Sequence, residues 1–258
     1  MMQAGLVSVT FKQKTCEDVI RYAAAARLKV IEWHGQNHVL HGDVGTARRI
    51  GQSTLDAGLA VAAYGSYYVV GQSEDMGLSF DTVLQTAEAL DAPMIRVWAG
   101  HQSPDATSNC TRATILEEAR RVADLAAEKR IKVVFEFHNN TLTQTGKSCA
   151  ALLGDLDHPN VGTYWQPAPE LDVSRNLTEL CTVLPWLVGL HVFHWGPTHM
   201  DRQALAQGEL DWAQYLAMAK QCHGTLNVLL EFVKGGTVEQ FNEDAITLHR
   251  LLASRNMV

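Results

Sequence analysis

The sequence predicts a single-domain (β/α)8 barrel, in which eight parallel strands close into a ring surrounded by helices. Short β-branched and aromatic runs alternate with longer stretches of helical periodicity along the 258 residues, which is typical of repeated strand–helix units. Eight such units can be counted. No linker rich in proline, glycine or serine interrupts them, so we expect one domain over residues 1–258.

The predicted strands are short apolar runs with many valine, isoleucine and aromatic residues. They cover residues 6–11, 29–33, 59–64, 94–98, 131–137, 161–165, 190–194 and 227–233. A doubly wound open sheet is the alternative to a barrel. No G-x-G-x-x-G motif follows the first run, and eight regular units favour closure.

Helices are predicted between these strands, because apolar residues return there at helical spacing. Ile115, Ala119, Val122 and Ala126 form one such stripe. Two helix starts can be proposed from local chemistry. Thr237 and Gln240 have the spacing of a capping box, and Asp211 is a candidate N-cap for the helix of the seventh unit.

The composition narrows the class of function. A hydrophobic fraction of 47% with 19% charged residues is that of an ordinary globular protein. The net charge of −7 argues against nucleic-acid binding. The five cysteines show no C-x-x-C spacing, and no run approaches the roughly 20 apolar residues of a membrane helix. Without a recognisable signal peptide, we expect a cytoplasmic protein with reduced thiols and no membrane partner.

In a barrel the active site lies at the carboxyl ends of the strands, so polar residues at those positions are the candidates. They are His34, Tyr64, Tyr67, Arg96, Trp98, Glu136, His138, Gln166, His191, His194 and Glu231. Glu136 and Glu231 are the most informative, because each interrupts an otherwise apolar strand. A buried carboxylate without a partner costs several kcal/mol or becomes protonated. Pairing with an arginine or lysine of a neighbouring strand is the structural alternative.

Strand alternation refines this set. Glu136 and His138 share one side of their strand, while Phe135 and Phe137 face the helices. His191 and His194 lie on opposite sides of a regular strand, and we select His191 as the strand-borne ligand. Glu136, His191 and Glu231 would form an oxygen and nitrogen site suited to Mn²⁺, Mg²⁺, Co²⁺ or Zn²⁺.

With these residues assembled, the chain resembles the xylose-isomerase-like superfamily of sugar isomerases and epimerases. That superfamily also includes inosose dehydratase, 3-dehydroshikimate dehydratase and an apurinic endonuclease. The resemblance runs nearly end to end. It is carried by Val-Ile-Glu-Trp-His-Gly, Ile-Arg-Val-Trp-Ala-Gly, Phe-Glu-Phe-His-Asn-Asn-Thr-Leu-Thr-Gln-Thr, His-Pro-Asn-Val-Gly, Leu-His-Val-Phe-His, Gly-Glu-Leu-Asp-Trp and Leu-Leu-Glu-Phe-Val.

The resemblance implies a metal site made of Glu136, His191, Glu231 and a fourth ligand from the sixth strand. At that place the superfamily usually has an aspartate, whereas this chain has Gln166. The neutral amide oxygen predicts weaker metal binding. The resemblance also implies that Arg202 holds substrate oxygens. The full substrate-binding set is His34, Tyr64, Arg96, Trp98, His138, His194 and Arg202.

The implied function is a metal-dependent isomerase or epimerase of a sugar, sugar acid or sugar phosphate, in which Glu136 and Glu231 move a proton next to a carbonyl. A dehydratase acting on a keto-polyol or keto-acid is the first alternative, because the Arg96 and His138 segments resemble that branch equally. A non-catalytic sugar-binding barrel is the second. The expected partner is a small carbohydrate or keto-acid, and a homodimer and a homotetramer both remain open.

Overall fold

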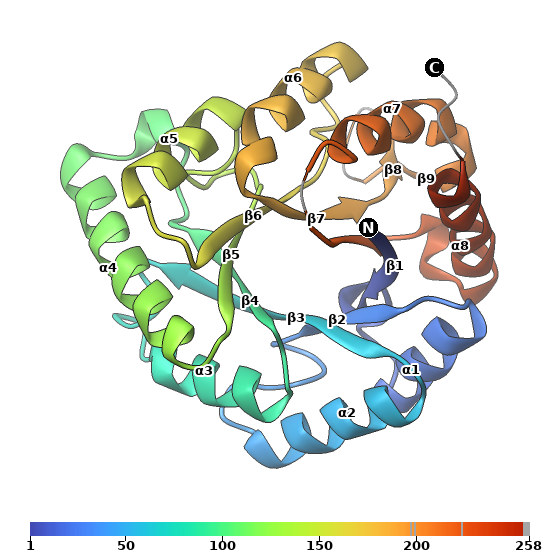
Figure 1. Cartoon of the computed structure of the whole chain (residues 1–258), viewed down its shortest axis with the longest axis horizontal. Coiled ribbons are helices and arrows are strands. Elements are labelled where there is room, and N and C mark those ends of the chain that lie inside the picture. Colours follow the sequence, from blue (N-terminus) through green and yellow to red (C-terminus); the bar gives the residue numbers. More distant parts are fainter. Residues whose placement is uncertain (197, 199, 223, 255–258) are drawn as a thin grey trace.

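The computed structural model describes residues 1–196, 198, 200–222 and 224–254. Eight parallel strands close into a barrel in the order β1-β10-β7-β6-β5-β4-β3-β2. The first and last strands of the ring lie side by side, with Met2 opposite Leu226, and the helices form an outer ring around the strands (Figure 1). The predicted single-domain barrel is therefore confirmed.

The barrel strands are β1 Met2–Val7, β2 Val30–His34, β3 Ala60–Val70, β4 Met94–Ala99, β5 Lys132–Glu136, β6 Val161–Trp165, β7 Leu187–Val192 and β10 Leu226–Leu230. Two short strands, β8 His194–Trp195 and β9 Arg202–Gln203, pair antiparallel outside the ring. They follow β7, so they shape the loop at its carboxyl end.

The helices are α1 Cys16–Ala25, α2 Val44–Asp56, α3 Phe80–Ala89, α4 Asn109–Glu128, α5 Gly146–Leu156, α6 Val173–Val183, α7 Glu209–Ala219 and α8 Val238–Ala253. Most begin at a side-chain cap that satisfies a free backbone N–H group. Thr237 accepts a hydrogen bond from the backbone of Gln240, as predicted.

Asp211 is not an N-cap, contrary to the prediction. The 3-10 turn Leu205–Gly208 leads directly into α7, so the helix begins at Glu209, three residues earlier than an N-cap at Asp211 would place it. Asp211 therefore lies in the first turn, where the helix dipole stabilises a carboxylate without a capping bond.

Four predicted strands differ from the structure by three or more residues at one end. The first strand is Met2–Val7, and residues 8–11 form a 3-10 turn. Strand β3 continues to Val70, with an irregular register between Gly65 and Tyr68. Strand β7 begins three residues earlier than expected and ends at Val192. The eighth was expected to reach residue 233, whereas β10 ends at Leu230. Each of these shifts changes which side chains reach the mouth of the barrel.

Two layers of buried residues hold the barrel together. The larger one lies between strands and helices and contains the predicted stripe Ile115, Ala119, Val122 and Ala126. A smaller one fills the inside of the barrel with residues such as Val7, Val134 and Leu229. Charged side chains replace this apolar filling farther along the strands, and that change marks the candidate site.

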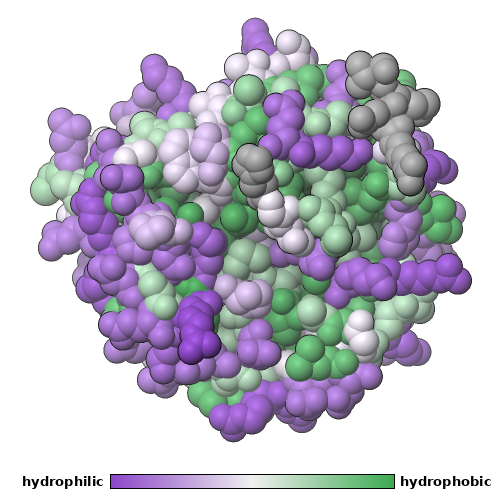
Figure 2. Space-filling model, in the orientation of Figure 1, coloured by the Kyte–Doolittle hydropathy of each residue, from purple (hydrophilic) through white to green (hydrophobic). Residues whose placement is uncertain are grey.

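The outer surface is mixed in polarity. On the face shown in Figure 2, hydrophilic side chains cover much of the periphery, and hydrophobic side chains appear mostly among them and nearer the centre. Among the helices of the described residues, none has both the length and the apolar character needed to cross a bilayer.

Candidate active site

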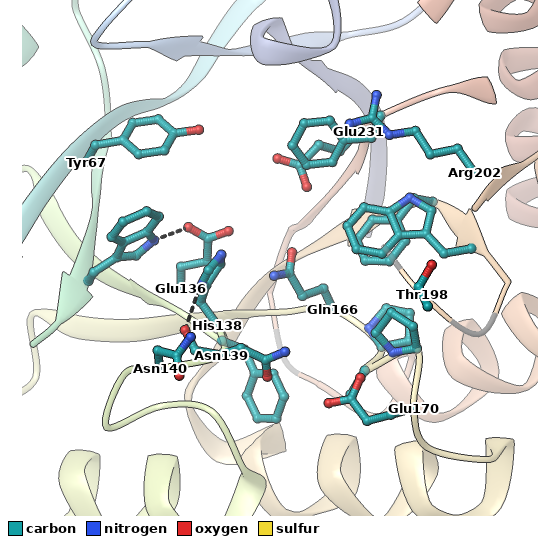
Figure 3. A pocket seen from close by; sticks show the side chains of 18 residues that line it. Tyr67, Glu136, His138, Asn139, Asn140, Gln166, Glu170, Thr198, Arg202 and Glu231 are labelled. Carbon is teal, nitrogen blue, oxygen red and sulfur yellow. Dashed lines mark hydrogen bonds between the residues drawn. The ribbon is translucent and has the colours of Figure 1, made fainter. Parts of the chain in front are cut away.

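A cavity of about 620 Å³ opens where the strands end, within the size range of small-molecule sites. Four residues form what we call the floor: Glu136, Gln166, His191 and Glu231. Five exposed residues of the cavity lining form what we call the rim, and they are Asn139, Asn140, Glu170, Thr198 and Arg202. Figure 3 shows Glu136, Gln166 and Glu231 pointing toward a common space, with the Tyr67 hydroxyl directed across it.

The floor residues bring ligand atoms together from four strand ends. One ligand atom from each of Glu136, His191 and Glu231 lies within 4.8 Å of the other two. His191 Nδ1 lies 3.2 Å from Gln166 Oε1, 3.5 Å from Glu136 Oε1 and 3.6 Å from Glu231 Oε2. Three oxygens from three side chains thus lie within 3.6 Å of one imidazole nitrogen.

A buried arginine connects two of the carboxylates near the floor. Arg96 Nε donates to Glu32 Oε1 at 2.6 Å, and Arg96 Nη1 donates to Glu136 Oε2. Trp98 Nε1 also donates to Glu136 Oε2, at 2.5 Å. The structural alternative considered for Glu136, pairing with a cation of a neighbouring strand, is therefore present. Glu231 differs, because it pairs with His191, whereas Arg96 pairs with Glu32 and Glu136.

This difference separates the two glutamates electrostatically. Burial raises the pKa of Glu136, but the Arg96 guanidinium and His191 outweigh burial and hold it well below its usual range. Burial raises the pKa of Glu231 to about 7, and the attraction of His191 only partly opposes this. Glu136 is thus held as a carboxylate, while Glu231 exchanges its proton near neutral pH.

The histidine responds to the surrounding carboxylates. Burial alone lowers the pKa of His191, but Glu231, Glu32 and Glu136 outweigh it and raise the pKa to about 10. The metal-free imidazole therefore carries a positive charge among the acidic groups. The carboxylates around His191 thus favour a positive charge at this position.

The donor set also fits a divalent cation. Carboxylate, amide and imidazole ligands suit Mg²⁺, Mn²⁺ and Zn²⁺, and the oxygens already point toward the His191 Nδ1 position. Glu136, His191 and Glu231, with the Gln166 amide oxygen, are the residues that could hold such an ion. Two of these four donors are carboxylates, one is an imidazole and one is a neutral amide.

Several predicted substrate residues line the cavity. His138 and Trp98 stand together, with ring centroids 4.8 Å apart. Arg202 lies at the rim, with its guanidinium 4.6 Å from the centroid of the Phe232 ring. Phe135 and Phe137 pack in the outer core, as alternation predicted.

Other predicted substrate residues lie elsewhere. Tyr64 is fully buried and donates to Val39 O at 2.9 Å, because alternation turns it toward the helices. His194 borders a neighbouring cavity of about 310 Å³. His34 is buried beside Tyr67, with ring centroids 4.4 Å apart. Burial, and next Arg96, lower the pKa of His34 to about 4. Arg96 itself lies beneath the lining.

Two residues of this site, Tyr67 and Glu32, have no role in the function implied by the sequence. Tyr67 is a candidate there only through its position after the third strand. It reaches the cavity because β3 is irregular there, and its backbone is left-handed, with φ 57°. Such conformations cost about 1–3 kcal/mol and gather at functional sites. Glu32 interrupts the apolar run Val-Ile-Glu-Trp-His, which is the same signal that identified Glu136 and Glu231.

Comparisons with known proteins show the family and the fold of this chain. The family model described as xylose isomerase-like TIM barrel matches residues 20–221. The 3-dehydroshikimate dehydratase of Bacillus anthracis is 27% identical over 168 residues, and the match spans 62% of this chain and 60% of that protein.

Solved structures share the whole fold. The crystal structure of a probable 3-DHS dehydratase from Bacillus anthracis has a TM-score of 0.78 at 18% identity, covering 99% of this chain and 100% of that one. The structure of a D-psicose 3-epimerase with D-fructose has a TM-score of 0.74 at 16% identity, covering 96% of this chain and 98% of the other. At these identities the likeness concerns the fold.

Proposed function

Because this chain belongs to the xylose isomerase-like TIM barrel family, we propose that it is a metal-dependent isomerase or epimerase that moves a proton next to the carbonyl of a small polyhydroxylated substrate. The proposal rests on one observation. Two buried carboxylates of different protonation behaviour, Glu136 and Glu231, face the same set of donor atoms at the floor of a cavity.

The two glutamates can divide the proton transfer between them. Glu136 is oriented through Oε2 by Arg96 and Trp98, which leaves Oε1 directed to the floor. Glu231 changes protonation near neutral pH, where a general acid or base is most effective. In the metal-free site Glu136 stays ionised while Glu231 gains and loses its proton, and a bound cation would favour the ionised, proton-accepting form of Glu231. Positioned groups of this kind contribute about 10²–10⁴-fold to a rate.

A divalent ion held by Glu136, Gln166, His191 and Glu231 would supply Lewis acidity that stabilises negative charge on substrate oxygens. The aromatic side chains of Tyr67, Trp98, Trp195 and Phe232 bound the space above the floor. They limit access of water and provide flat apolar faces for the carbon skeleton of the substrate.

The charge of the lining favours a substrate without phosphate. Among the described residues that line the cavity, Arg202 is the only lysine or arginine, and the acidic Glu170 also lies at the rim. Phosphate recognition ordinarily uses several cationic or backbone donors. A neutral polyol ketone, or a keto-acid whose carboxylate meets Arg202, suits this lining better.

Dehydration is the second candidate. It is supported by the 27% sequence identity that this chain shares with the 3-dehydroshikimate dehydratase of Bacillus anthracis over 168 residues. Both reactions begin with removal of a proton next to a carbonyl. They diverge when a β-hydroxyl group leaves, which also needs a proton donor. The Glu136 and Glu231 pair can serve either outcome.

The test is a survey of unphosphorylated ketoses and keto-acids with Mn²⁺-loaded protein in D₂O, followed by proton NMR. Loss of the NMR signal of the proton next to the carbonyl, through exchange with deuterium, would show the proton removal that both reactions share. A stereoisomeric product supports epimerisation, and a conjugated product with new ultraviolet absorbance supports dehydration. Binding of these compounds without any exchange, isomer or elimination product would overturn the enzymatic proposal and favour a sugar-binding barrel.

A further inference from the structure

Glu32 lies on β2 below the floor, fully buried and outside the cavity lining. We propose that Glu32 is a positioning residue that turns His191 Nδ1 toward the metal position and fixes Arg96 against Glu136. This inference rests on the metal site of the proposed function. It adds a residue that touches neither substrate nor metal and acts through two others.

Each oxygen of Glu32 faces a different donor. Oε1 accepts from Arg96 Nε at 2.6 Å, and Oε2 lies 3.4 Å from His191 Nε2. All three side chains are almost completely excluded from solvent, with exposures of 0–1%. In such surroundings an unpaired donor or acceptor is costly, so the two contacts fix both partners.

The His191 contact determines which ring nitrogen is presented to the floor. A proton on Nε2 points to Glu32 Oε2, and the Nδ1 lone pair then points to Gln166, Glu136 and Glu231. Metal-binding histidines commonly donate their second N–H group to a carboxylate, which fixes the tautomer and the ring orientation. Glu32 is placed to accept that proton.

The Arg96 contact acts on the other side of the site. The planar guanidinium uses Nε for Glu32 and Nη1 for Glu136, so the position of one carboxylate determines that of the other. Gly65 preserves the necessary space. A Cβ atom at Gly65 would lie 2.7 Å from Glu32 Oε1 and 2.9 Å from Arg96 Nη2.

The carboxylate is required because both of its oxygens accept. A glutamine at position 32 has the same shape but offers one acceptor oxygen and one NH₂ donor. It can satisfy Arg96 Nε or His191 Nε2–H, but not both. In Glu32→Gln the new NH₂ group therefore faces another donor, either Arg96 Nε–H or His191 Nε2–H. The volume of the side chain changes very little.

The first test uses the unmodified protein. Long-range proton–nitrogen NMR spectra of the Zn²⁺-loaded chain distinguish the two imidazole nitrogens of His191. We expect a protonated Nε2 and a metal-bound Nδ1. A metal bound through Nε2, with the proton on Nδ1, would overturn the proposal, and this measurement does not depend on any variant folding.

The second test compares Mn²⁺ affinity by calorimetry in Glu32→Gln and a matched variant. Asp244→Asn makes the same change at another buried carboxylate, which accepts from Leu205 N and Gln240 Nε2 in the loop before α7 and in α8. Loss of a carboxylate behind a metal ligand typically weakens binding by about 10–100-fold. We expect that loss for Glu32→Gln and unchanged affinity for Asp244→Asn.

The outcomes separate this inference from the proposed function. If the unmodified protein binds no Mn²⁺, the metal site itself fails. If it binds Mn²⁺ and a folded Glu32→Gln binds equally well, only the role of Glu32 is refuted. If Glu32→Gln does not fold, Gly65→Ala displaces the Glu32–Arg96 pair while keeping every polar group. We then expect weaker Mn²⁺ binding, and unchanged affinity would contradict the proposal.

Discussion

At the floor of the cavity the charged side chains are buried and face partners of opposite charge, whereas at the rim they are exposed. Glu136 and His191 sit within hydrogen-bonding or ion-pairing distance of several groups. Arg202 and Glu170 are open to solvent, and Arg202 rests on the ring of Phe232. A buried network holds one geometry, while exposed side chains on loops adapt at low cost.

Under the proposed function the two regions would have separate tasks. The buried floor would place donors around one ion and separate the protonation of two glutamates. The exposed rim would offer a cation and polar groups for selecting a substrate. Substitutions at the floor should therefore change turnover or folding, and those at the rim should change the Michaelis constant.

The largest expected effect is on catalysis. Glu231→Gln removes the group that exchanges a proton near neutral pH, so kcat should fall by about 10²–10⁴-fold with the far-ultraviolet circular dichroism unchanged. Glu170→Gln makes the same change at the rim and should alter kcat by less than about threefold, within the range of exposed polar groups. An equal fall in kcat in the two variants would contradict the separate roles of floor and rim.

A comparable effect is expected on stability when the floor loses its arginine. Arg96→Leu removes the guanidinium that pairs with both Glu32 and Glu136, and removal of one partner from a buried ion pair costs about 3–5 kcal/mol. Arg49→Leu breaks an exposed pair with Glu17 and should cost less than about 1 kcal/mol. Urea unfolding measures both. A small loss for Arg96→Leu would show that the buried network is not a stabilising unit.

A smaller effect is expected at the rim. Arg202→Ala removes the guanidinium that lies over Phe232, and it should raise the Michaelis constant for a carboxylate substrate by about tenfold, the size of one charged hydrogen bond. A neutral ketose should be affected less, and kcat should change little. Steady-state kinetics on one substrate of each type checks this, and a fall in kcat alone would place Arg202 with the floor.

Strand order, helix stripes and the floor could be predicted from the sequence because they follow periodic patterns. Glu136 and Glu231 stand out as carboxylates within apolar strands, and parallel strands bring their ends together. The same pattern marks Glu32. Its pairing with Arg96 joins side chains 64 positions apart, and no local pattern records such a contact.

The rim and the aromatic side chains could not be predicted in the same way. Tyr67 rather than Tyr64 reaches the cavity because of an irregular register in β3, and the position of a tyrosine after the strand does not reveal that irregularity. His194 is directed toward the neighbouring cavity because a two-residue strand turns the chain after β7. Loop geometry of this kind depends on tertiary packing rather than on residue type.

The most direct measurement is a calorimetric titration of metal-stripped protein with Mn²⁺, comparing the unmodified chain with Gln166→Glu. The amide oxygen already lies 3.2 Å from His191 Nδ1, and glutamate has the same length with an added negative charge. We expect one ion per chain in both proteins and at least about tenfold tighter binding by the variant, since a third anionic ligand strengthens attraction for a hard cation. Equal or weaker binding by the variant would exclude Gln166 as a ligand. No binding by the unmodified protein would contradict a metal site formed by Glu136, Gln166, His191 and Glu231.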